Sequence, residues 1–168
     1  MHIRDSFLGE FDREMANTRK TLERVPDDKW DWKPHPKSGT MGWLAAHVGG
    51  MTEWTIMTFD RSELDINPAG EKPSFTPPKN RSELLAKFDK DLVQARQRLA
   101  AAEDSAMMAN WTLLAGGQTI FSMPRVAVLR AFVMNHMIHH RAQLTVYLRL
   151  NDIPVPALYG PSGDEGGF

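Results

Sequence analysis

The chain contains the stretch Asn135-His136-Met137-Ile138-His139-His140-Arg141-Ala142-Gln143-Leu144, which sets two histidines four residues apart in an apolar helical segment. On an α-helix, residues 136 and 140 lie about 40° apart around the axis and about 6 Å apart along it, so both imidazoles project from one strip of surface. The same strip carries the apolar residues Leu129, Phe132, Val133, Leu144 and Tyr147. We therefore expect both histidines to face the interior, where one divalent ion could bind both rings.

Length and composition favour a single domain over residues 1–168. A hydrophobic content of 42% with 24% charged residues is ordinary for a globular protein with a full core. Lysines and arginines number 20 against 21 acidic residues, and neither sign forms a long run. The charge pattern therefore predicts no nucleic-acid or membrane partner. The N-terminal residues lack a signal-peptide pattern, and the apolar runs are too short to span a membrane, which indicates a cytoplasmic protein.

The chain has no cysteine. This excludes disulfides, thiolate metal ligands, iron–sulfur clusters and a cysteine nucleophile. Any bound metal must therefore have nitrogen and oxygen ligands.

Apolar residues recur at steps of three and four in several segments, which predicts amphipathic helices. We expect a first helix over 3–25, a second over 41–60 capped by Ser38 or Thr40, a third that begins after Asn80 or Ser82, and a fourth from 124 to about 150. Residues 61–80 predict a long crossover, and residues 104–124 either a small hairpin or an irregular loop. The expected fold class is all-α, a four-helix bundle.

Bundles build metal sites from side chains on facing helices, so a third ligand should come from another helix. His47 is the candidate, because it lies at the edge of the apolar face of the predicted second helix. The alternative for a histidine in this position is a core residue that is hydrogen-bonded to the backbone. The candidate metal ligands are thus His47, His136 and His140.

The residues around the histidine pair leave several roles open. Met137 stands where a zincin helix has its general base, so a metalloprotease is not expected and no catalytic acid or base is identified. Gln143 could orient His140 or satisfy a buried backbone group. His139 points away from the pair and is not assigned as a ligand, and Arg141 is expected on a solvated face.

Three segments resemble the DinB-like family of small metal-binding proteins: residues 36–47, which end at His47, residues 135–144, and residues 153–162. The resemblance implies an up-down-down-up four-helix bundle that forms a homodimer. It also implies a divalent ion on a histidine triad, whose positions here are His47, His136 and His140. Relatives commonly have glycine where this chain has Ala142.

The family resemblance points to several functions. Relatives include transferases that use low-molecular-weight thiols, a thiol-dependent isomerase and proteins with a proposed hydrolase role. The leading hypothesis is a metal-dependent transferase that acts on a small-molecule substrate, in which Zn or Ni, or else Co, Fe or Mn, activates an exogenous thiol. The alternatives are a metal-dependent hydrolase and a non-catalytic metal-binding or interaction protein.

Overall fold

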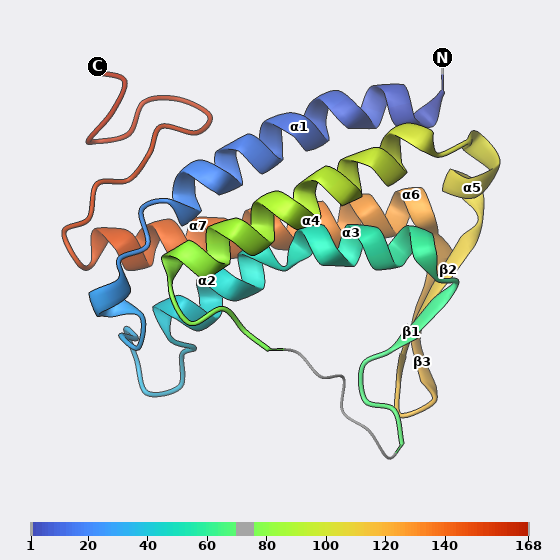
Figure 1. Cartoon of the computed structure of the whole chain (residues 1–168), viewed down its shortest axis with the longest axis horizontal. Coiled ribbons are helices and arrows are strands. Elements are labelled where there is room, and N and C mark those ends of the chain that lie inside the picture. Colours follow the sequence, from blue (N-terminus) through green and yellow to red (C-terminus); the bar gives the residue numbers. More distant parts are fainter. Residues whose placement is uncertain (1, 70–75, 168) are drawn as a thin grey trace.

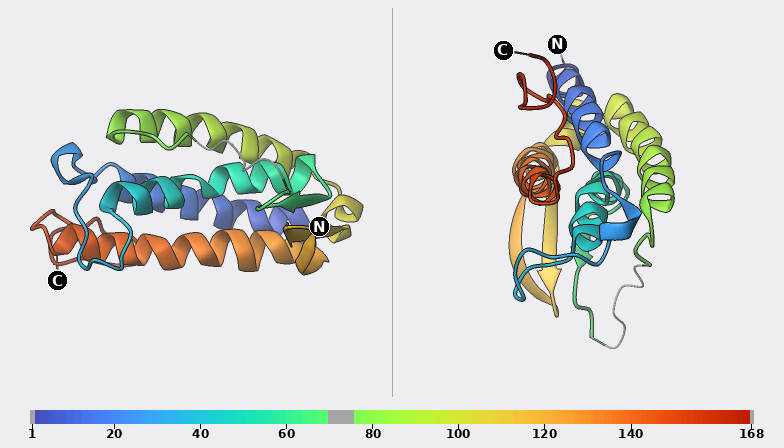
Figure 2. Two further views of the ribbon diagram at one scale, coloured as in Figure 1. Left: turned by 90° about the horizontal axis from the view of Figure 1, so that it is seen from below. Right: turned by 90° about the vertical axis from the view of Figure 1, so that its left-hand side faces the viewer.

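The computed structural model describes residues 2–69 and 76–167, and long helices dominate it (Figure 1). These helices lie side by side and run nearly parallel to one another (Figure 2). They are α1 (Ile3–Leu22), α2 (Met41–Gly49), α3 (Met51–Asp60), α4 (Arg81–Ala101) and a continuous run of α6 (Arg125–Ala127), η2 (Val128–Met134) and α7 (Asn135–Arg149). Shorter helices are η1 (Asp27–Lys29) and α5 (Asp104–Met108). Residues 70–75 of the predicted crossover lie outside the described residues.

Helices α1 and α4 follow the apolar patterns of the sequence. The buried face of α1 includes Phe7, Phe11 and Met15, and that of α4 includes Phe88 and Leu99. The two helices pack against each other. They therefore form one wall of the core because their apolar residues recur at helical spacing.

The predicted second helix is divided into α2 and α3 at Gly50. Thr40, one of the two predicted caps, accepts a hydrogen bond from the Trp43 amide at 3.1 Å. Gly42 lies against the indole of Trp30, and a Cβ at this glycine would lie 2.3 Å from the ring. The first turn of α2 can approach the preceding loop only because residue 42 has no side chain.

A three-stranded mixed sheet occupies one end of the molecule (Figure 1). Strand β1 (Glu63–Asp65) pairs in parallel with β2 (Asn110–Ala115), which pairs antiparallel with β3 (Gln118–Pro124). Gly116 and Gly117 have φ angles of 60° and 76° and form the tight turn of the hairpin. The Asp65 carboxylate accepts hydrogen bonds from both glycine amides, at 2.9 and 2.7 Å, and so fixes β1 to this turn.

The prediction of an all-α four-helix bundle is therefore wrong. Of the two alternatives for residues 104–124, the structure has the hairpin, preceded by α5. It adds β1, which lies in the predicted crossover, and the three strands form a sheet. In β2 the side chains of Trp111 and Leu113 are buried, and this alternation of buried positions stabilises a strand against α3 and η2 rather than a loop.

Residues 125–149 form one continuous helical rod, in which η2 is a π-helix. A π-helix has i to i+5 hydrogen bonds and a wider turn than an α-helix. Phe132 lies in this segment, and its ring centroid is 5.7 Å from that of His136. The wide turn thus comes immediately before the two histidines of α7.

The C-terminal residues 151–167 are irregular and return over α1 (Figure 1). Tyr159 from this segment donates a hydrogen bond to Glu14 on α1 at 2.6 Å. Across residues 2–69 and 76–167, every helix is too short or too polar to span a lipid bilayer.

Candidate metal centre

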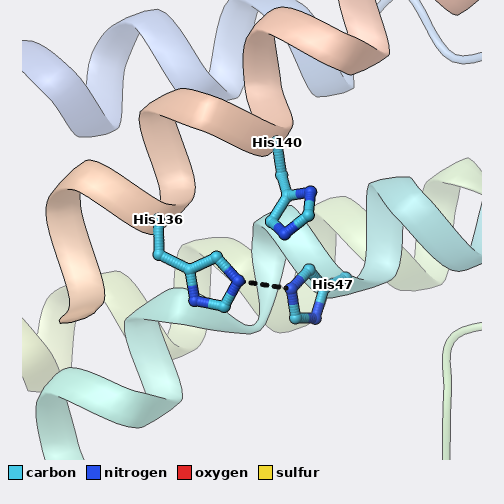
Figure 3. A group of neighbouring side chains, drawn as sticks. All are labelled: His47, His136 and His140. Atoms are coloured by element: carbon cyan, nitrogen blue, oxygen red, sulfur yellow. Dashed lines mark hydrogen bonds between the residues drawn. The ribbon is translucent and has the colours of Figure 1, made fainter.

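Helices α2 and α7 pack against each other and bring three histidines together (Figure 3). His47 lies in the last turn of α2, whereas His136 and His140 lie on consecutive turns of α7. All three side chains are half-buried. The structure thus brings together the three residues that the sequence proposed as ligands, from two elements separated by almost ninety residues of chain.

One ring nitrogen from each histidine lies within 4.8 Å of the other two. The Nε2 atoms of His47 and His136 are 3.2 Å apart, and the ring centroid of His140 is 4.7 Å from each of the other two centroids. Two nitrogens bound to one tetrahedral ion at about 2.0–2.1 Å would be about 3.3 Å apart. The arrangement therefore fits a divalent ion, although metal binding itself stays a prediction.

The histidine rings are held by neighbouring groups. The Nδ1 atom of His140 lies 2.7 Å from Gln143 Oε1. The ring of His47 is stacked on Trp43, with 5.2 Å between centroids and 6° between planes. Metal-binding histidines typically use the nitrogen that does not bind the metal for such contacts.

The pKa values of His47 and His136 favour the neutral, metal-binding form. Burial lowers the pKa of His47 to about 4, and the neighbouring His140 and His136 add to this effect. Burial also lowers the pKa of His136, with a further contribution from His140. At neutral pH these two imidazoles are uncharged, and each has a lone pair that can bind a cation.

Two open roles on α7 can now be assigned. Gln143 is exposed and contacts His140, so its side chain does not satisfy a buried backbone group. His139 is also exposed, and its Nε2 lies 3.1 Å from Gln143 Nε2. It lies outside the three-histidine cluster, as expected.

The expectation that Arg141 lies on a solvated face is wrong, because Arg141 is only 1% exposed. Its guanidinium donates to Glu14 Oε2 at 2.6 Å, to the Glu14 carbonyl at 2.9 Å and to Thr18 Oγ1 at 3.0 Å. It also donates to the hydroxyl of Tyr159. This network joins α7 to α1 and to the exposed Tyr159 of the C-terminal segment.

A signal for this burial was present in the sequence. Four residues of α7 at helical spacing are buried: Met137, Arg141, Leu144 and Leu148. An arginine within an otherwise apolar stripe indicates a buried cation that requires a paired acid. Glu14 lies on the buried face of α1 in the same way.

A family model and the solved structures of similar proteins all point to the DinB superfamily. A family model described as the DinB superfamily matches residues 10–144. The protein YrdA of Bacillus subtilis (strain 168) is 27% identical to the chain over 169 residues, which cover 96% of the chain and 90% of YrdA.

Two crystal structures share the fold. A DinB-like protein from Bacillus cereus ATCC 10987 has a TM-score of 0.70 at 22% identity, and the match covers 92% of this chain and 97% of the Bacillus cereus protein. The DinB-like protein YjoA from Bacillus subtilis has a TM-score of 0.62 at 15% identity, and the match covers 90% of this chain and 96% of YjoA. At these identities the likeness concerns the fold alone.

Proposed function

The chain belongs to the DinB superfamily, whose model matches residues 10–144, and on that premise we propose that it binds one divalent metal ion through His47, His136 and His140. The observation that carries this proposal is the convergence of three imidazole nitrogens within 4.8 Å of one another. Zinc or nickel is the preferred ion, since imidazole ligands suit both, and cobalt, iron and manganese are alternatives. Three protein ligands are the number typical of catalytic zinc sites.

We further propose that the site catalyses transfer of a low-molecular-weight thiol to an electrophilic small molecule. A thiol that binds such an ion becomes a thiolate at neutral pH and is then nucleophilic. Because the chain has no cysteine, the thiol must be exogenous. The proposal places the protein in the cytoplasm, where such thiols are kept reduced.

The residues of the cluster argue against hydrolysis of the zincin type. A zincin helix places a glutamate base close to the attacking water. The cluster itself consists of histidines, and Met137 occupies the equivalent helix position with a fully buried side chain. Thiol transfer requires no such base once the thiol is ionised.

A thiol-transfer assay tests the reaction. The protein is loaded with Zn²⁺ or Ni²⁺ and mixed with common cellular thiols and a panel of electrophiles, with free metal and the His136→Ala variant as controls. The proposal predicts thiol-dependent turnover above free metal that is lost in the variant. Turnover without thiol would favour a hydrolase, and absence of turnover with bound metal would favour a non-catalytic metal-binding protein.

We also propose that the chain acts as a homodimer, as its family membership suggests. Light scattering on the protein as it elutes from a size-exclusion column should give twice the mass of one chain. A monomer at micromolar concentration would contradict this part of the proposal.

A further inference from the structure

The exposed side chain of Gln143 lies between two histidines of α7. Its Oε1 atom is 2.7 Å from His140 Nδ1, and its Nε2 atom is 3.1 Å from His139 Nε2. Gln143 follows His140 by three residues and His139 by four, so its side chain neighbours both on the helix surface. Their contacts form a short chain of hydrogen bonds that ends at a candidate metal ligand.

The chemistry of the amide defines the direction of each bond. An amide oxygen only accepts and an amide nitrogen only donates. The contact with Oε1 therefore requires a hydrogen on His140 Nδ1, and the contact with Gln143 Nε2 requires a lone pair on His139 Nε2. A neutral His140 with its hydrogen on Nδ1 has its available lone pair on Nε2.

We propose that Gln143 is a positioning residue that fixes His140 in the Nδ1–H tautomer and so directs the Nε2 lone pair of His140 to His47 and His136. Without this partner both tautomers are open to His140, and one of them blocks Nε2 with a hydrogen. The inference extends the proposed function, because the fixed lone pair is the one that a metal ion would use.

The Nε2 atom of His136, the other candidate ligand on α7, lies 3.2 Å from that of His47. A hydrogen-bond partner on the ring nitrogen that does not bind the metal typically contributes 10- to 100-fold to metal affinity.

The tautomer can be measured in metal-free protein, which keeps this test independent of metal binding. Long-range ¹H–¹⁵N correlation spectra distinguish Nδ1–H from Nε2–H for each histidine. At neutral pH we expect Nδ1–H for His140 in the wild type and in Gln143→Glu, which keeps the acceptor oxygen, and loss of this preference in Gln143→Leu. Nε2–H in the wild type, or Nδ1–H retained in Gln143→Leu, would overturn the proposal.

Metal affinity supplies the second readout. In competition with a chelator, Gln143→Leu should bind Zn²⁺ about 10- to 100-fold more weakly than the wild type, while Gln143→Glu should bind at least as well. Val146→Ala, an exposed position one turn along α7, is the matched control and should bind as the wild type does. Equal affinity in Gln143→Leu would overturn the positioning role. If the wild type binds no Zn²⁺, the proposed function fails and the tautomer measurement still decides this inference.

Discussion

Replacing Arg141 with methionine should destabilise the protein strongly. Arg141 and Glu14 are 1% and 3% exposed, and their side chains are joined at 2.6 Å. Methionine fills a similar volume but leaves the buried Glu14 carboxylate with only the Tyr159 hydroxyl and the exposed guanidinium of Arg13, 3.9 Å away. It also removes the donors to the Glu14 carbonyl and to Thr18 Oγ1.

The magnitude follows from this burial. Removal of one partner of a buried ion pair costs about 3–5 kcal/mol, because the remaining charge is buried without compensation. In a protein of this size each kcal/mol lowers the melting temperature by roughly 2–4 °C. We therefore expect Arg141→Met to lower the melting temperature by roughly 6–20 °C.

The assay is urea unfolding of metal-free protein at neutral pH, so that bound metal does not contribute. The double variant Glu14→Leu with Arg141→Met is the control, because an apolar pair of similar volume often restores stability. It should recover most of the loss. A loss below about 1 kcal/mol in Arg141→Met, the value of an exposed pair, would show that the Arg141–Glu14 pair is not a buried ion pair in solution.

Three further predictions concern the cap of α2, pH and bound metal. Thr40→Ala should lower the free energy of unfolding by about 1 kcal/mol, because it removes the side chain that caps the Trp43 amide. Ser38→Ala should leave this free energy unchanged, and equal losses for the two variants in urea unfolding would contradict the assignment of Thr40 as the cap. The pKa of His47 is about 4 when folded and 6.5 in the reference state, so the unfolded chain binds more protons between these values, and stability should fall as the pH is lowered through this window. Urea unfolding at several pH values should show a weaker fall in His47→Leu, and an unchanged slope would argue against a shifted histidine. Zn²⁺ at 100 times its Kd should raise the apparent free energy of unfolding, measured by thermal denaturation, by about 2.7 kcal/mol in the wild type. The increase should be far smaller in His136→Ala. An equal increase in both proteins would place the ion at another site.

The long helices could be predicted because their residues carry a strong local pattern. The stripe that contains Phe7, Phe11 and Met15 predicts the buried face of α1 without knowledge of its neighbours. Thr40 and Asn80 are recognisable caps because their side chains accept hydrogen bonds from amides three residues ahead. In both cases the decisive contacts lie within a few residues of sequence.

The hairpin was one of two alternatives from the sequence, but the pairing of β1 with it could not be predicted, because it depends on contacts distant in sequence. Strand β1 has only three residues, too few to show an alternation, and its partner residues lie about fifty positions away in β2. The side chain of Asp65 joins the two segments through Gly116 and Gly117. Nothing local to residues 63–65 distinguishes them from a loop.

The candidate site was accessible to sequence reasoning for similar reasons. His136 and His140 share a helix, so their spacing alone places both rings on one side. The position of His47 required a facing helix, which its apolar surroundings and the family resemblance both suggested. The π-helix before His136 and the pairing of Arg141 with Glu14 depend on packing between distant elements, and only the structure shows them.

The metal content of untagged protein, purified without added metal and measured by mass spectrometry, tests whether the three histidines bind an ion. We predict about one divalent ion per chain in the wild type. We also predict loss of that ion in both His47→Ala and His136→Ala, with each variant still folded by circular dichroism. A wild type that contains no metal and takes up none on titration would contradict the account, as would an ion retained at full stoichiometry in both variants.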